Sequence, residues 1–247
     1  MEEQLLKKRI LELRKRVSFA YRIEFTDFLN LSEIDTAKTV LQGSNFMFYG
    51  GLPDTERQML CIAPDEIEIT PELFPIRCVQ VQPKSVKFAE AISHRDVLGS
   101  VLGLGLDRDV IGDIFVKDKE AYVLCAERIA EFLTEQLTQV RHTNVHCSLA
   151  ERDAYAFEKE FRLVTRTVSA VRIDSVAAAA FGVSRSTAAT AISGGKVFIN
   201  GREITSPSAS VKEQDVISYR GEGKARLKEI GGLTKKGRIS VTLERYQ

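Results

Sequence analysis

Basic side chains near the end of this 247-residue chain are spaced so that they could bind a phosphate backbone. Arg185 follows Ser184 at the expected start of a helix, where free backbone N–H groups favour an anion. Lys196 and Arg202 flank the short run VFING, and Arg172 lies upstream. None of these cations falls on an apolar stripe, so we expect them to share one exposed surface that could hold phosphates. The alternative is an ordinary solvated face.

The residues between these cations predict two short helices followed by a tight hairpin. The Ala-rich run from Ile173 to Phe181 predicts the first helix, and Ser184 is a typical N-cap for the second. Val197 to Ile199 predict a strand. Asn200 and Gly201 come next, and this dipeptide favours a type I′ turn because both central residues need positive φ.

This pattern resembles the S4 RNA-binding domain. The residues that carry the resemblance are Arg172-Ile-Asp174, Gly182-Val-Ser184-Arg185, Ala188-Ala189, Ile192, Gly195-Lys-Val197, Asn200-Gly201 and Asp215-Val-Ile217. It implies that Arg172, Arg185, Lys196 and Arg202 hold an RNA backbone, that Ser184 caps the recognition helix and bonds a phosphate, and that Asn200 serves the turn first and RNA second. Gln214 departs from the family pattern, which has Gly there.

A basic segment follows the S4-like stretch. Residues 220–226 predict a glycine-flanked loop, which adds Arg220, Lys224 and Arg226 to the expected RNA contacts. Glu222 makes that loop less basic than the related ones. An alternating pattern from Arg238 to Arg245 predicts the final strand.

The charge of the chain is uneven. Its net charge is only +1, yet 13 Lys and Arg oppose 7 Asp and Glu from Arg172 onward, whereas 22 oppose 27 before it. An acidic body with a basic end is typical of a protein that meets an anionic partner. The cysteines form no Cys-x-x-Cys pair, and the sequence has no apolar run of about 20 residues. Because the chain is charged from Glu2 onward, we do not expect a signal peptide there. We therefore expect a cytoplasmic protein with buried free thiols, no metal site and no contact with a membrane.

The pattern of elements predicts an α+β chain of three domains. Residues 1–75 are expected to form a helical segment and a β-hairpin, with a packed turn near Phe25 to Leu29 and a helix from Glu33 to Leu41 capped by Ser32. Residues 76–160 follow the strand-helix-strand-strand-helix-strand order of a ferredoxin-like, RRM-like sandwich, with its first helix near Phe88 to Leu102. Residues 161–247 are assigned to the S4 domain together with a connecting strand, whose pattern starts at Glu158-Lys-Glu160.

An unusual run from Ser93 to Gly99, continuing to Asp113, lies in the middle domain. Its glycines do not follow a strand, so it lacks the context of a nucleotide-binding loop. His94 and Arg95 beside Asp96 could form an acid–base set, but no nucleophile stands next to them. We take His94 and Arg95 as a second contact with RNA. Similarly, His142 and His146 are not expected to bind metal.

Together, a Ser-His-Arg-Asp-x-Leu-Gly run and a C-terminal S4 domain resemble the YlmH group of bacterial S4 proteins. The resemblance implies binding of rRNA or tRNA on the large ribosomal subunit, in translation or in the rescue of stalled ribosomes, without enzymatic activity, a cofactor or a small-molecule substrate. One alternative is an RNA-modifying enzyme, although the Gly-Arg-Leu-Asp element of the S4-bearing pseudouridine synthases is missing, as is the cofactor loop of the S4-bearing methyltransferases. The other is an adaptor whose basic face binds an acidic protein.

Overall fold

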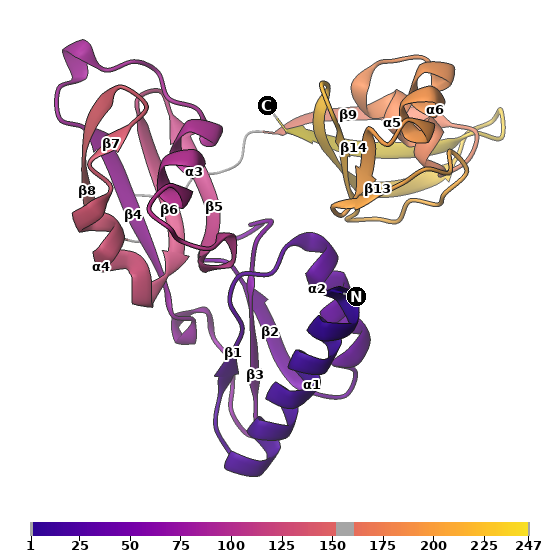
Figure 1. Ribbon diagram of the computed structural model, residues 1–247. Coiled ribbons are helices and arrows are strands. Elements are labelled where there is room, and N and C mark those ends of the chain that lie inside the picture. Colours follow the sequence, from indigo (N-terminus) through magenta and orange to yellow (C-terminus); the bar gives the residue numbers. More distant parts are fainter. Residues whose placement is uncertain (1, 152–160, 247) are drawn as a thin grey trace. The chain divides into compact units, whose positions relative to one another are not determined.

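The computed structural model describes residues 2–151 and 161–246. The chain divides into two compact units, Met1–Ala156 and Phe157–Gln247. Figure 1 shows the first unit as two groups of elements, an N-terminal one in indigo and a central one in magenta, and the second unit in orange and yellow. All pairs between the described strands are antiparallel.

The N-terminal part of the first unit packs helices against a small sheet. Its elements are α1 (Glu2–Ala20), β1 (Glu24–Phe25), α2 (Leu31–Val40), β2 (Asn45–Tyr49) and β3 (Met59–Ala63), with strand order β1-β3-β2. Apolar residues three and four apart on α1, namely Ile10, Leu13 and Val17, are buried in one cluster with residues of α2 and β3. The predicted hairpin of β2 and β3 is confirmed.

Two details of this part differ from the sequence-based expectation. Residues 24–25 pair with β3 as a strand instead of forming a packed helical turn. Asn30, and not Ser32, is the N-cap of α2, because its side chain accepts the Glu33 N–H at 3.0 Å while the Glu33 carboxylate accepts the Asn30 N–H at 2.7 Å. This reciprocal capping box satisfies two N–H groups, whereas a cap at Ser32 would satisfy one.

The central part is a five-stranded sheet with two helices. Its main elements are β4 (Ile76–Pro83), α3 (His94–Leu102), β5 (Ile111–Lys117), β6 (Glu120–Ala126), α4 (Glu127–Gln136), β7 (Gln139–Val140) and β8 (Thr143–Leu149), joined by the 3-10 turns Pro71–Leu73, Val86–Phe88 and Arg108–Val110. The order β5-β6-β4-β8-β7 confirms the predicted ferredoxin-like arrangement, extended by the short β7. Helix α3 begins at His94 rather than near Phe88, because Ser93 and Asp96 form a capping box there.

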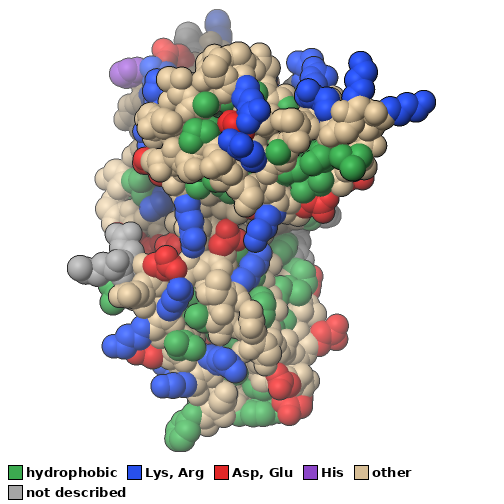
Figure 2. All heavy atoms as spheres, turned by 90° about the vertical axis from the view of Figure 1, so that its right-hand side faces the viewer, with side chains coloured by type: hydrophobic (Ala, Val, Ile, Leu, Met, Phe, Trp, Pro, Cys, Tyr) green, Lys and Arg blue, Asp and Glu red, His purple; other side chains and the backbone are tan. Residues whose placement is uncertain are grey.

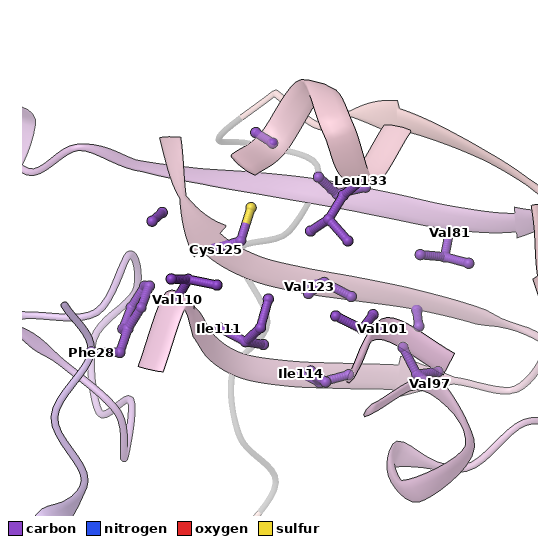
Figure 3. Packing of buried hydrophobic residues seen from close by; sticks show 14 of the residues in the cluster. Phe28, Val81, Val97, Val101, Val110, Ile111, Ile114, Val123, Cys125 and Leu133 are labelled. Carbon is purple, nitrogen blue, oxygen red and sulfur yellow. The ribbon is translucent and has the colours of Figure 1, made fainter. Parts of the chain in front are cut away.

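Apolar side chains from both helices and the sheet form the core of the central part. Figure 3 shows Val97 and Val101 of α3 and Leu133 of α4 around the strands. Phe28, from the N-terminal part, reaches this core beside Val110. The Phe28 N–H also donates to the Asp109 carbonyl at 2.8 Å, so the two parts of the first unit share hydrogen bonds as well as apolar contacts.

The four cysteines are confirmed as free and buried. Burial raises the pKa of the Cys61 and Cys125 thiols to about 12 and that of Cys147 to about 11, because a thiolate loses hydration there. Within residues 2–151 and 161–246, no group of three or more His, Cys, Asp or Glu side chains could hold a metal ion. No helix in the same ranges has the length and apolarity needed to cross a membrane.

The second unit places two short helices on a six-stranded sheet. Its elements are β9 (Phe161–Val168), α5 (Ile173–Phe181), α6 (Arg185–Ser193), β10 (Val197–Ile199), β11 (Arg202–Glu203), β12 (Val216–Tyr219), β13 (Gly223–Leu233) and β14 (Ile239–Tyr246). The strand order is β11-β10-β12-β13-β14-β9. The helices and the first strand of the hairpin have the predicted bounds. The predicted connecting strand is β9, while its expected start at Glu158 lies outside the described residues.

Candidate nucleic-acid interface

The short turn between α5 and α6 orients the first residues of α6. Gly182 ends α5 in the left-handed region, with φ of 72°, which glycine adopts without a steric penalty. Ser184 then caps α6: its hydroxyl accepts the Thr187 N–H at 3.0 Å and lies 2.7 Å from the Thr187 hydroxyl. The predicted cap is therefore present, and it holds Arg185 in the first turn of an exposed helix start.

A buried carboxylate joins two of the predicted cations. Asp174, in the first turn of α5, has a side chain only 5% exposed. Its Oδ2 accepts Arg185 Nε at 2.9 Å and Arg185 Nη2 at 2.8 Å, and it also accepts Arg172 Nη2 at 3.2 Å. Its Oδ1 accepts the Ser175 N–H at 2.8 Å. Thus Asp174 fixes both guanidinium groups, whose side chains remain 39% and 51% exposed.

Backbone pairing brings Lys196 next to Arg220. The Arg220 N–H donates to the Lys196 carbonyl at 2.9 Å, at the ends of the paired strands β10 and β12. Both side chains are exposed, and the Arg220 guanidinium lies 4.7 Å from the centre of the Phe198 ring. Arg202 is exposed on β11, opposite Ile199. The hairpin therefore presents Lys196, Arg202 and Arg220 from one small group of paired strands.

The Asn200-Gly201 turn has the predicted geometry. Asn200 has φ of 49° and Gly201 has φ of 78°, as a type I′ turn requires. The Asn200 amide donates to Asp215 Oδ1 at 2.9 Å, and its carbonyl oxygen accepts the Val216 N–H at 2.9 Å. Both ends of this side chain thus connect the turn to the start of β12, which agrees with its expected first role.

Gln214 takes the backbone conformation that the resemblance implies for a glycine. Its φ is 70°, in the left-handed region, and its N–H donates to the Leu227 carbonyl at 2.7 Å. The turn before β12 is therefore kept although the residue has a Cβ. A left-handed conformation costs an ordinary residue roughly 1–2 kcal/mol, which this pairing must offset.

The predicted basic loop is shorter than expected. Lys224 and Arg226 lie within β13, paired with Ser218 and Val216, so only residues 220–222 form a turn. Arg226 donates to the Glu244 carboxylate at 2.6 and 2.8 Å, and its side chain is 16% exposed. Lys228 also binds Glu244, at 2.8 Å. The structure therefore places Arg226 in a mostly buried ion pair on the sheet, unlike the exposed Arg220.

The second predicted contact lies in the other unit. His94 and Arg95 are exposed in the first turn of α3. Asp96 accepts hydrogen bonds from the Ser93 hydroxyl at 2.6 Å and from its N–H at 2.9 Å, and these bonds lower the pKa of the Asp96 carboxyl. Arg141 lies 3.7 Å from the same carboxylate. Asp96 thus completes the capping box of α3, in which Ser93 is the N-cap.

Two features were not found by sequence reasoning. Asp174 belonged to the S4-like pattern, but no role was given to it. The sequence feature that could have indicated its ion pairs was a carboxylate two residues after Arg172. A second group of cations stands on the β13–β14 connection, at Lys235, Lys236 and Arg238. The sequence feature that could have indicated this group was the absence of acidic residues from 230 to 243. Figure 2 shows Lys and Arg side chains standing out from the surface of the C-terminal unit.

Three family models match the chain in succession. They are described as "YlmH, N-terminal" over residues 2–67, "Putative RNA-binding domain in YlmH" over residues 70–154 and "S4 domain" over residues 171–217. A curated relative from Bacillus subtilis (strain 168), "Ribosome-associated protein quality control protein P2", is 33% identical over 96% of this chain and 93% of its own length.

A solved structure is similar in fold to part of this chain. The "Cell division protein ylmH from Streptococcus pneumoniae" covers 64% of this chain and 96% of its own, with a TM-score of 0.54 and 19% sequence identity. At that identity, the match concerns the fold alone.

Proposed function

Because the chain belongs to the YlmH family of S4-domain proteins, we propose that it is a non-enzymatic protein that binds structured RNA, rRNA or tRNA, through its C-terminal unit. The observation that carries this proposal is the Arg172–Asp174–Arg185 cluster at the start of α5 and α6. One buried carboxylate holds two half-exposed guanidinium groups beside a capped helix N-terminus. Such preorganised donors suit the fixed phosphates of a folded RNA.

The neighbouring hairpin extends this surface. Lys196, Arg202 and Arg220 add three exposed cations, one just before β10, one on β11 and one just after β12. Arginine donates to phosphate in a planar fork and lysine acts as a point charge, so the set combines orientation with long-range attraction. In A-form RNA the major groove is closed to side chains, so phosphate and shape contacts should dominate. Lys224 adds positive charge along β13, whereas the charge of Arg226 is mainly engaged in its ion pair with Glu244.

The cellular setting of the proposal comes from the relative. That Bacillus subtilis protein is named as ribosome-associated and as a protein of quality control. This likeness supports the proposal that the present chain acts in the cytoplasm, on the large ribosomal subunit, in translation or in the rescue of stalled ribosomes. The match of residues 70–154 to a putative RNA-binding domain supports the exposed His94 and Arg95 as a further contact.

Co-sedimentation with purified ribosomal subunits tests the proposal. The wild-type chain is expected to sediment with the large subunit, and Arg185→Ala/Lys196→Ala is expected to stay in the supernatant. Each phosphate contact contributes about 0.7 to 0.9 to the slope of log affinity against log salt, so the double variant should lower that slope by roughly 1.4 to 1.8.

The control is Lys8→Ala/Lys15→Ala, which removes the same two charges from exposed positions of α1. It should sediment like the wild type. A wild-type chain that binds neither ribosomal subunits nor their extracted RNA would refute the proposed function.

A further inference from the structure

A second basic surface lies in the C-terminal unit, outside residues 171–217 that match the S4 model. The connection between β13 and β14, from Leu233 to Arg238, is called the hairpin tip here (Figure 1). Lys235, Lys236 and Arg238 are exposed, and the Leu233 side chain is 74% exposed. No acidic residue occurs between 230 and 243, so these cations have no negative neighbour along the hairpin.

The hairpin tip is held in one conformation by its own hydrogen bonds. The Thr234 N–H donates to the Arg238 carbonyl at 2.7 Å, and the Arg238 N–H donates to the Thr234 hydroxyl at 3.1 Å. The Gly237 N–H donates to the Thr234 carbonyl at 2.9 Å, in a turn that needs the φ of 70° found at Gly237. A rigid turn that presents two lysines loses little backbone entropy when an anion binds.

Arg238 ties this tip to the edge strand β9. Its Nε donates to the Thr167 hydroxyl at 3.0 Å, and its Nη2 donates to the Thr167 carbonyl. Strand β9 carries Arg162 and Arg166, both exposed, and residues 161–173 include no acidic side chain. Charges on β9 also discourage pairing with another sheet edge. That explanation does not extend to the lysines at the tip, which lie beyond the paired strands.

Two adjacent glycines leave the backbone bare next to the tip. Gly231 and Gly232 lie in β13, and neither has a positive φ, so no turn demands them. A side chain at Gly232 would meet nothing within 4 Å. The pairing of β13 with β14 shifts register between Ile230 and Leu233, so the glycines mark a bulge, as glycine inside a strand often does. The bulge leaves the backbone at Gly232 exposed beside the cations of the tip, where backbone N–H groups and basic side chains can both contact phosphates.

The hairpin tip lies within reach of the S4 surface. Thr167, which binds Arg238, is five residues from Arg172, and five residues span at most about 18 Å when fully extended. Resting on the proposed function, we infer that the hairpin tip is a second RNA-binding site. It holds the phosphate backbone of the same RNA through Lys235, Lys236 and Arg238. The C-terminal unit then contacts its RNA at two separate points.

The test measures the affinity of the full chain for a fluorescein-labelled RNA stem-loop cut from ribosomal RNA, at several salt concentrations. Five proteins are compared: the wild type, Lys235→Ala/Lys236→Ala, Lys235→Arg/Lys236→Arg, Arg185→Ala/Lys196→Ala and Lys8→Ala/Lys15→Ala. Loss of two phosphate contacts at the tip should weaken binding about 15- to 30-fold at 0.15 M salt and lower the salt slope by roughly 1.4 to 1.8. Lys235→Arg/Lys236→Arg should keep the affinity and the salt slope of the wild type, because only the positive charges are needed.

The outcomes separate this inference from the proposed function. If the tip variant binds with the affinity and slope of the wild type while Arg185→Ala/Lys196→Ala binds weakly, the tip is not an RNA site and the proposed function stands. If the α1 variant loses as much affinity as the tip variant, the effect is one of net charge and the inference fails. If neither the wild type nor any variant binds RNA, and the chain binds an acidic protein instead, both proposals fail.

Discussion

Asp174→Asn tests whether a buried carboxylate prepares the arginine surface for RNA. The substitution keeps the size of the side chain and an oxygen that can accept the Ser175 N–H. It replaces the charged acceptor of Arg172 and Arg185 with an amide that lacks a negative charge. The neutral side chain also makes the surface more positive by one charge, so two opposing effects must be compared.

The stability effect follows from the contacts. Hydrogen bonds to charged groups contribute about 1.5–3 kcal/mol each when buried, but the two arginines are half exposed, so water replaces part of what they lose. We expect a loss of about 2 kcal/mol in the free energy of unfolding. For a unit of this size, about 1 kcal/mol shifts Tm by roughly 4–8 °C, so the C-terminal unit should melt about 8–16 °C lower.

The effect on binding follows from the freedom given to the arginines. An arginine side chain carries about 2 kcal/mol of rotamer entropy, which Asp174 removes in advance for Arg185. Removing a negative charge near a phosphate returns about 1 kcal/mol or less in water. The balance is a loss of about 1 kcal/mol, or roughly fivefold weaker RNA binding. The salt slope should rise by up to about 0.9, because one more cation lacks an internal partner.

Fluorescence anisotropy with labelled RNA, at temperatures well below the melting of the variant, measures the affinity and its salt slope. Glu203→Gln is the matched control, since it removes an exposed carboxylate from β11. That variant should bind RNA slightly more tightly than the wild type. If Asp174→Asn also binds more tightly, the carboxylate only masks charge and the argument for preorganisation is wrong.

Two further predictions concern stability. Burial opposes ionisation of Glu244, but the hydrogen bonds from Lys228 and Arg226 outweigh it and lower its pKa. The stability that ionised Glu244 contributes is therefore present above the unfolded pKa of 4.5 and is lost as pH falls through the folded pKa. Urea unfolding measured from pH 6 downward should show that Glu244→Gln reduces the slope of the free energy of unfolding against pH. An unchanged slope would contradict this. Gly112→Ala should cost about 1–3 kcal/mol in urea unfolding, because its Cβ would lie 2.8 Å from the Phe28 ring, whereas Gly99→Ala, with open space around it, should not.

Local chemistry was enough to predict the S4-like segment. Gly182, Ser184 and the Asn200-Gly201 turn each have a short-range physical preference, and the structure gives each of them the predicted backbone role. The ferredoxin-like order was also predictable, because alternating apolar patterns identify strands and helices wherever the pattern is long. Helix starts were predicted less well, because Asn30 and Ser93 begin their helices through capping boxes that the apolar pattern alone does not reveal.

The sequence by itself determined which cations are available and which turns present them, because these depend on residues close together in the chain. Only the tertiary structure decided how those cations are used. Arg226 was expected in a loop, but pairing of β13 with β14 places it against Glu244, 18 residues away. Arg185 was expected on the exposed start of a helix, and the packing of α5 against α6 also brings it to Asp174, 11 residues away. Contacts over such separations depend on how elements pack, and no local propensity encodes them.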